Sequence, residues 1–308
     1  MLKGLPAPIH GAIMALLLFV NTLFWVTPLY VLILFKLLTP SGTAPRRALD
    51  RAIAWLAQSW SMCNIMFSKV LMAVEVEVNI EPQLNPKGQY LVCCNPQTWN
   101  DIFMLMYAFG RRAPFFKFFL KQELIWVPLL GLAWWGLDYP FMKRHSRQDL
   151  AKNPALRGSD IETTKRACAR YKGQPVMILN FLEGTRFTAE KHRRQKSPYT
   201  HLLKPKAGGF AFALSAMGRN LDSLLDVTIA YPGGAQGFWP FLCGQVKQVR
   251  IDVRELRIPD EWFEGDYEGS QPFRAGFQRW LADLWHEKDA RMAHMLSAEG
   301  TSATAKPD

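Results

Sequence analysis

The longest hydrophobic pattern in this chain lies close to its amino terminus. Between Gly11 and Lys36 there is no charged residue, and residues 13–35 are almost wholly apolar. A run of this length exceeds the ~20 residues that a helix needs to cross a bilayer. Asn21 and Pro28 interrupt the run, so a kinked span and a re-entrant hairpin both fit the pattern.

Basic residues follow this apolar run more densely than they precede it. Lys36, Arg46, Arg47 and Arg51 come at or after its end, whereas Lys3 alone precedes it. Cytoplasmic flanks of membrane segments carry the excess of lysine and arginine. The charge pattern therefore places the following domain on the cytoplasmic side of a membrane.

Shorter periodic patterns predict further elements. Apolar residues recur every three or four positions across residues 51–72, which predicts a helix that either lies on a membrane or faces a core. Strict alternation at 74–78 and 249–254 predicts half-exposed strands. One apolar face across 273–292 predicts a packing helix. Residues 190–196 are basic without a period, which is typical of a loop.

Two apolar runs end abruptly in polar clusters. Tyr90–Cys94 predicts a buried strand that stops at Asn95 and Pro96, because proline cannot donate to a sheet. Thr98 with Asp101 three positions later resembles a helix-start signal, and the apolar residues 102–109 follow as the expected helix.

The second run, residues 176–182, ends in Glu183, Gly184, Thr185 and Arg186. Arginine binds phosphate with two parallel hydrogen bonds, and glycine allows close backbone approach. Open α/β sheets bind their ligands where parallel strands end. The two clusters together predict an anion site.

The composition of the chain indicates which classes of binding partner to expect. The formal net charge is +11, which favours anionic partners. The five cysteines do not have the spacing of a zinc site. The chain has neither a Walker-type nucleotide-binding loop nor a dinucleotide-binding motif. We expect reduced thiols and no metal. Beside an apolar anchor, the basic residues favour a phospholipid membrane surface over nucleic acid.

The motifs in order resemble the glycerolipid acyltransferases, the 1-acyl-sn-glycerol-3-phosphate acyltransferase family, in its bacterial inner-membrane form. The first block of that family, Asn-His-x-x-x-x-Asp, corresponds to residues 95–101. The second corresponds to 140–144, the third (Phe-x-Glu-Gly-Thr-Arg) to 181–186, and the fourth to 227–232.

The resemblance implies an α/β fold, with a central, largely parallel sheet and flanking helices behind an amino-terminal membrane segment. It implies transfer of a fatty acyl group from acyl-CoA or acyl carrier protein to a lysophospholipid such as 1-acyl-glycerol-3-phosphate. These donors are co-substrates, and no bound cofactor is expected. The catalytic domain is expected on the cytoplasmic face of a bacterial inner membrane.

The same resemblance assigns roles to individual residues. Residues of the second and third blocks are expected at the substrate phosphate: Lys143, Arg144, Glu183, Gly184, Thr185 and Arg186. Lys206 and Gly208 match, more weakly, an element near the acyl donor. The tryptophan- and leucine-rich residues 124–137 correspond to a region that helps to form the fatty-chain tunnel, although a plain core or a membrane-facing surface would have the same composition.

One departure from the family concerns the catalytic base. The family has a histidine directly after the motif asparagine, where this chain has Pro96, and the motif aspartate that orients that histidine is Asp101. Proline cannot accept a proton from a hydroxyl group. His145, beside two cations, is a candidate replacement base. Two hypotheses follow: an acyltransferase whose base is replaced or lost, and a non-catalytic lipid-binding or membrane scaffold protein.

The expected organisation has four parts. Residues 1–40 form a membrane anchor, and 41–73 form the amphipathic or interfacial helix region. Residues 74–296 form the acyltransferase-like α/β domain, and 297–308 form a disordered tail.

Overall fold

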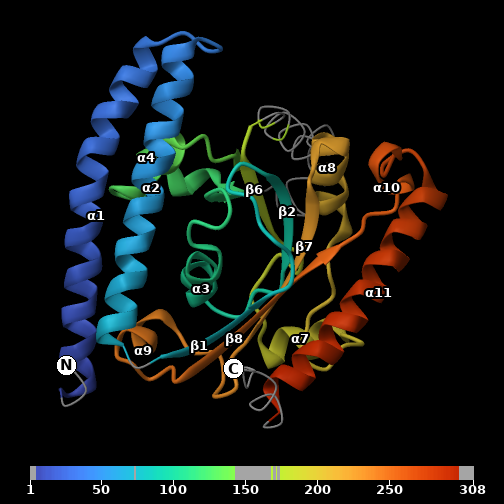
Figure 1. The fold of residues 1–308 in the computed structure, drawn as a ribbon. Coiled ribbons are helices and arrows are strands. Elements are labelled where there is room, and N and C mark those ends of the chain that lie inside the picture. The colour runs from blue at the N-terminus through green and yellow to red at the C-terminus, as the bar shows by residue number, and fades with distance from the viewer. Residues whose placement is uncertain (1–4, 73, 143–167, 169–170, 172–173, 298–308) are drawn as a thin grey trace, which may run out of the picture.

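The computed structural model describes residues 5–72, 74–142, 168, 171 and 174–297. Lys143, Arg144 and His145 lie outside the described residues, as does nearly all of the tail predicted from residue 297. In the described part, a central sheet separates two layers of helices, and a long two-helix hairpin packs at one side (Figure 1).

The central sheet has six strands in the order β1-β8-β7-β2-β6-β3. Their bounds are β1 Glu75–Ile80, β2 Gln89–Cys94, β3 Phe116–Phe118, β6 Val176–Phe181, β7 Ser223–Ala230 and β8 Gln248–Leu256. Every neighbouring pair is parallel except β7 with β8. The largely parallel α/β sheet predicted from the sequence is therefore confirmed. A second, two-stranded sheet pairs β4 (Leu120–Lys121) with β5 (Phe141–Met142).

The middle strands are apolar because helices cover both of their faces. Every residue of β7 is buried. On one face, Val92 and Cys94 of β2 pack with α3 (Asn100–Phe109). On the other face, Leu91 and Cys93 pack with α8 (Ala207–Met217) and α11 (Gln271–Leu296). All five cysteines are free, and four of them are buried.

The other helical elements whose bounds the structure describes are short. They are η1 Gln122–Trp126, α4 Leu130–Gly136, α7 Ala189–Gln195, η3 Gly218–Asn220, α9 Phe238–Leu242 and α10 Glu261–Glu264.

The hairpin consists of α1 (Ala7–Leu38) and α2 (Ala44–Leu71), which pack against each other along their length (Figure 1). α1 continues through Pro28 without a break, so the structure favours one long helix over a re-entrant turn. The Asn21 amide donates to the Asn64 side chain at 2.7 Å and to the Trp60 carbonyl at 3.1 Å. This polar residue in an apolar run therefore bonds α1 to α2.

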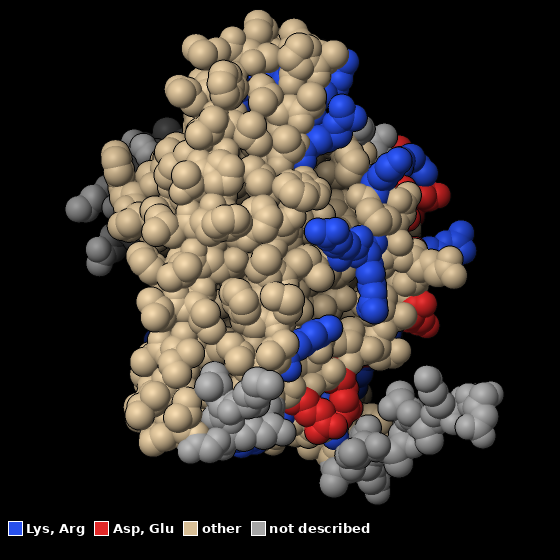
Figure 2. All heavy atoms as spheres, turned by 60° about the vertical axis from the view of Figure 1, so that its left-hand side comes forward, with Lys and Arg blue, Asp and Glu red and all other residues tan. Residues whose placement is uncertain are grey.

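α1 is long and apolar enough to span a membrane. Its outward side exposes large residues such as Leu16, Phe24 and Leu38. The face on this side of the molecule is dominated by uncharged residues, with lysine and arginine gathered mainly toward one edge (Figure 2). This surface fits the expected anchor, by length and composition.

Three elements differ from the sequence predictions. α2 begins at Ala44 instead of near residue 51, because the Thr43 hydroxyl caps it by accepting from the Arg46 N–H at 3.3 Å. Its inward face packs on α1 and α3, while Trp55 on its other side is exposed. Residues 190–196 were expected as a loop, but most of them form α7, which is too short to show a period. The apolar run of residues 115–120 suggests one continuous strand by its composition, but it divides into β3 and the start of β4.

Candidate active site

The two polar clusters predicted from the sequence meet because their strands are neighbours. β2 and β6 are parallel, and Cys94 lies opposite Phe181 at their carboxyl ends. The loops that follow enclose a cavity of about 340 Å³. Its lining includes Pro96 and Trp99 together with the polar or charged side chains of Asp101, Lys121, Thr185 and Arg186. The structure therefore brings together the two loops that the sequence analysis singled out.

Asp101 organises the first loop. One oxygen accepts hydrogen bonds from the Gln97 and Thr98 N–H groups at 2.6 and 2.9 Å, and the other accepts from the Tyr231 hydroxyl at 2.8 Å. Burial raises the pKa of Asp101 to about 6, and these three hydrogen bonds act in the opposite direction. The Thr98 hydroxyl does not cap α3 as predicted, because it donates to the Gln236 carbonyl.

The arrangement leaves Asp101 with spare capacity. An ionised carboxylate has about four acceptor positions, and three are occupied by the bonds just described. Pro96, which lines the same cavity, has no side-chain donor for the remaining position. A histidine ring nitrogen at that residue would supply one.

Asn95 fixes the start of the loop to the sheet. Its amide donates to the Ile229 carbonyl at 2.9 Å and accepts from the Ile229 N–H at 3.0 Å. The backbone pairing of β2 with β7 ends at Cys94 and Val227. The Asn95 side chain continues it by bonding the backbone of Ile229, on the side of β7 that faces β2. The motif asparagine therefore holds Pro96 and Asp101 in place relative to the sheet.

The second loop is a tight turn. Gly184 adopts φ +66°, a left-handed conformation that side chains rarely tolerate. The Arg186 guanidinium lies 3.9 Å from the centre of the Trp99 ring, a cation–π contact that joins the two loops. The Phe187 N–H donates to the Pro96 carbonyl at 3.0 Å. The two loops thus form one continuous wall of the cavity.

Two lysines extend this turn. The Lys191 ammonium of α7 donates to the Thr185 hydroxyl at 2.8 Å and to the Arg186 carbonyl at 3.0 Å. The Lys206 ammonium packs against Gly184, where an added Cβ would lie 2.9 Å from its nitrogen. Gly208 instead faces Tyr267, 3.7 Å from its would-be Cβ. Lys206 therefore lies at the turn of the third block, while Gly208 lies away from it.

Glu183 differs from the rest of its motif because it points into the protein. It is fully buried, and the neighbouring donors, the Leu203 N–H and the Trp285 side chain, do not reach either carboxyl oxygen with the geometry of a full hydrogen bond. Burial raises the pKa of Glu183 to about 8, although the Leu203 N–H, Lys288 and Trp285 act in the opposite direction. At neutral pH the carboxyl group is therefore mainly uncharged, and it does not offset the cations of the turn.

Sequence reasoning missed the contribution of α11, which was expected only as a packing helix. The fully buried Lys288 donates to the Val227 carbonyl at 2.7 Å and pairs with Asp226 at 2.5 Å. Met292 contacts the Asn95 amide through its sulfur at 3.6 Å. Only the charge of Lys288 within an otherwise apolar helical face signalled this role. α11 thus contacts both β7 and the first loop through the buried side chains of Lys288 and Met292.

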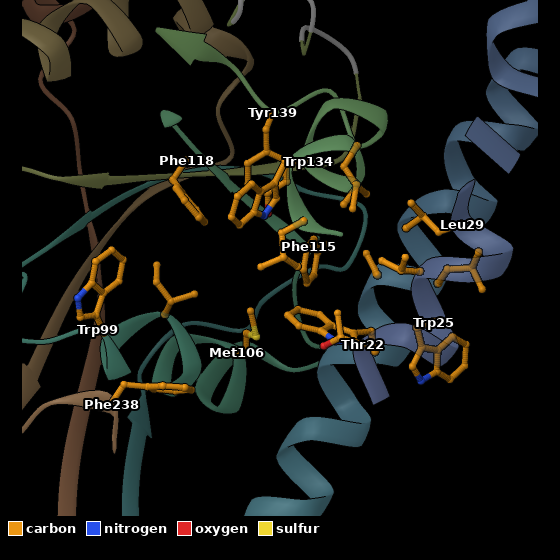
Figure 3. Close-up of a pocket in the computed structure, with 18 residues that line it drawn as sticks. Thr22, Trp25, Leu29, Trp99, Met106, Phe115, Phe118, Trp134, Tyr139 and Phe238 are labelled. Atoms are coloured by element: carbon orange, nitrogen blue, oxygen red, sulfur yellow. The ribbon is translucent and has the colours of Figure 1, made fainter. Parts of the chain in front are cut away.

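A second cavity, of about 520 Å³ and almost wholly apolar, shares part of its lining with the polar one. Figure 3 shows the residues that line this second cavity. It lies between the α1–α2 hairpin and the elements α3, β3 and α4, and Thr22, Trp25, Leu29, Met106 and Trp134 line it. Trp99, Ile102 and Phe118 border both cavities. Among the described residues, no cluster of histidine, cysteine, aspartate and glutamate is suited to hold a metal ion.

Comparison with known proteins places this arrangement in a family. The chain is 25% identical to the 2-acyl-1-lysophosphatidylinositol acyltransferase of Saccharomyces cerevisiae, over 68% of this chain and 62% of that protein. It is 30% identical to the 1-acyl-sn-glycerol-3-phosphate acyltransferase gamma of Mus musculus, over 56% of this chain and 44% of that protein. It is 26% identical to lysocardiolipin acyltransferase 1 of Danio rerio, over 88% and 66%. The chain thus spans about half to two thirds of these relatives.

A solved structure has the same fold. The 1-acyl-sn-glycerophosphate (LPA) acyltransferase PlsC from Thermotoga maritima superposes with a TM-score of 0.50 at 16% identity, covering 91% of this chain and 98% of that one. The Acyltransferase family model matches residues 75–232, which include both loops of the site. The chain therefore belongs to the acyltransferase family whose relatives include the lysophospholipid and 1-acyl-glycerol-3-phosphate acyltransferases.

Proposed function

We propose that this chain is an acyltransferase that binds a lysophospholipid, 1-acyl-glycerol-3-phosphate, as its acceptor. The fatty acyl group would come from acyl-CoA or acyl carrier protein. The observation that carries the proposal is the junction of the two cavities at Trp99, Ile102 and Phe118. A polar cavity with a cationic wall suits a phosphate, and the adjoining apolar cavity suits a fatty chain. The ester-forming atoms would then lie beside Pro96 and Asp101.

Phosphate binding rests on the turn that follows β6. Arg186 presents a guanidinium at the cavity wall, and the Thr185 hydroxyl lies beside it. Lys191 and Lys206 add positive charge at the same turn. These three cations outnumber the single carboxyl group of Glu183, which burial keeps mainly neutral at pH 7, so the turn carries a net positive charge. A phosphate group is favoured there by charge-assisted hydrogen bonds.

The chemical step is where the chain departs from its family. Acyl transfer requires removal of the acceptor hydroxyl proton as the oxygen attacks the thioester carbonyl, and the thiol then leaves. Pro96 supplies no base. Asp101 lines the cavity, but its three hydrogen bonds hold it as an orienting group. The unmodified chain is therefore expected to transfer acyl groups slowly.

That departure supports a second candidate function, a lipid-binding or membrane scaffold protein. A catalytic base contributes roughly 10²–10⁴-fold to the rate, whereas the phosphate turn and the apolar cavity do not depend on residue 96. Lipid binding would survive where transfer is lost. The two candidates share one site and differ only in turnover.

We further propose that the chain sits at a phospholipid membrane, on the cytoplasmic face of a bacterial inner membrane. The apolar side of α1 and exposed aromatic residues such as Trp55, Trp126 and Trp239 support this placement. Tryptophan is enriched where protein meets the membrane–water interface. The apolar cavity lies against the α1–α2 hairpin, so a fatty chain would enter it from the lipid. No nucleic-acid partner is proposed.

The test of the site is a lipid titration of the purified chain in micelles. We expect saturable binding of lysophosphatidate, and weaker binding of monoacylglycerol, which lacks the phosphate. Arg186→Ala should reduce lysophosphatidate affinity by about tenfold, since a hydrogen bond to a charged group contributes about 1.5–3 kcal/mol. Arg193→Ala, an exposed change on α7, is the control. Equal affinity for the two lipids would remove the phosphate site from the account.

A further inference from the structure

Lys191 makes a contact with the phosphate turn that no motif in the sequence indicates. Thr188 caps α7 by accepting from the Lys191 N–H at 3.2 Å. This cap fixes the start of the helix so that the Lys191 side chain reaches back over the preceding turn. Its ammonium bonds the Thr185 hydroxyl at 2.8 Å and the Arg186 carbonyl at 3.0 Å, in a half-buried position.

These bonds determine what the Thr185 hydroxyl can do. An ammonium group only donates hydrogen bonds, so Lys191 occupies a lone pair of the hydroxyl oxygen. The single hydroxyl proton takes no part in this bond and can be donated to a different acceptor. Within the described part of the chain, this hydroxyl has no other hydrogen-bond partner, and Thr185 lines the polar cavity. The hydroxyl proton is therefore free to be donated to an anion in that cavity.

The bond to Arg186 acts on the same turn. By holding the Arg186 carbonyl, Lys191 restrains the backbone from which the guanidinium extends over Trp99. The neighbouring cations of α7 behave differently: Arg193 and Arg194 are exposed. The position of Lys191, rather than the basic character of the helix, sets it apart.

We propose that Lys191 is a positioning residue for the acceptor phosphate, which makes the Thr185 hydroxyl a hydrogen-bond donor to a phosphomonoester lipid and fixes the backbone of Arg186. The inference rests on the proposed lysophospholipid site and adds a residue to it. Lys191 acts through Thr185 and Arg186, so removing it should affect the phosphate and leave the fatty chain unaffected.

The experiment is a double-mutant cycle read out by lipid binding to the full chain in micelles. The proteins are the unmodified chain, Lys191→Met, Thr185→Val, the double variant, and Arg193→Met as a control with the same loss of charge. The probes are lysophosphatidate and monoacylglycerol. Lys191→Met should weaken lysophosphatidate binding by about tenfold, and monoacylglycerol binding and the control should change by less than about twofold.

The cycle separates positioning from an independent charge effect. Since Lys191 acts in part through Thr185, the double variant should bind more tightly than the product of the two single losses predicts. Losses that simply multiply, or an equal loss of monoacylglycerol binding, would contradict the inference. Unchanged lysophosphatidate affinity in Lys191→Met, with Arg186→Ala still impaired, would overturn this inference alone. No lysophosphatidate binding by the unmodified chain would overturn the proposed function as well.

Discussion

Glu183→Gln removes a carboxyl group that folding buries and leaves without a well-formed hydrogen bond. Glu183 is fully buried between the phosphate turn and α11, and burial raises its pKa from 4.5 to about 8. Between these two values the unfolded chain has lost this proton, while the folded chain retains it. The folded state therefore binds more protons, and its stability falls as the pH rises through this window.

The size of the effect follows from the pKa difference. Each pH unit within the window costs about 1.36 kcal/mol of unfolding free energy. Asp101, with a pKa of about 6, contributes the same sign of change at lower pH. Between about pH 6.5 and pH 8 we expect Glu183 to cost on the order of 1–2 kcal/mol, less than the full slope because the folded carboxyl begins to ionise near pH 8. Burial lowers the pKa of Lys117 to about 8, which acts in the opposite direction in this window, so the contribution of Glu183 is read from the difference between the unmodified chain and Glu183→Gln.

The assay is denaturant unfolding in micelles at several pH values, for the unmodified chain, Glu183→Gln and Glu190→Gln. Glu190 is an exposed carboxylate on α7 and serves as the control. Glu183→Gln should flatten the fall in stability with pH, even if the buried amide lowers stability by a constant amount. Parallel pH profiles for the unmodified chain and Glu183→Gln would refute the reasoning, because they would show that folding does not raise the Glu183 pKa.

Three further outcomes are expected. Full-length protein should stay with the membrane during carbonate extraction because of the apolar helix α1, and complete release would rule out an integral anchor. Lys288→Met should destabilise the fold by about 3–5 kcal/mol because it leaves Asp226 buried with less compensation; an unchanged denaturation midpoint would show that the pair is dispensable. Ala133→Trp fills the apolar cavity, so it should weaken binding of long-chain lysophosphatidate more than short-chain, and equal effects would place the fatty chain elsewhere.

The sheet was predictable because its signals are local. The apolar runs of β2 and β6 reflect burial on both faces, and the alternation of the edge strand β1 and its neighbour β8 reflects partial exposure of their side chains. Each run also ended where its polar cluster begins, so both loops were found. The parallel pairing that brings Cys94 opposite Phe181 involves residues far apart in the chain, and only the family resemblance anticipated it.

The rest of the site depends on tertiary contacts without a local signal. Nothing in the spacing of residues indicated that Tyr231 bonds Asp101 or that Lys191 reaches Thr185. Glu183 belongs to the motif by sequence, yet its side chain is buried near Trp285 and Lys288 of α11 and does not line the cavity. Motifs identify which residues gather at a site, while the direction of each side chain follows from packing.

The catalytic capacity of the site is tested most directly at residue 96. Pro96→His restores the motif pattern of the family, and Asp101 retains one acceptor position for the imidazole. The substitution also removes the fixed φ of proline, while the Phe187 N–H continues to hold the carbonyl of residue 96. The new ring is therefore expected to lie within the cavity beside Asp101.

The measurement is thioester consumption with paired product detection, using lysophosphatidate and acyl-CoA, for the unmodified chain, Pro96→His and Pro96→His with Asp101→Ala. We predict transfer by Pro96→His at roughly 10²–10⁴ times the rate of the unmodified chain, and loss of that gain in the double variant. Full activity in the unmodified chain would show that another residue serves as base, with His145 the first to test. A folded, lipid-binding Pro96→His variant without transfer would contradict the catalytic account and leave the scaffold function.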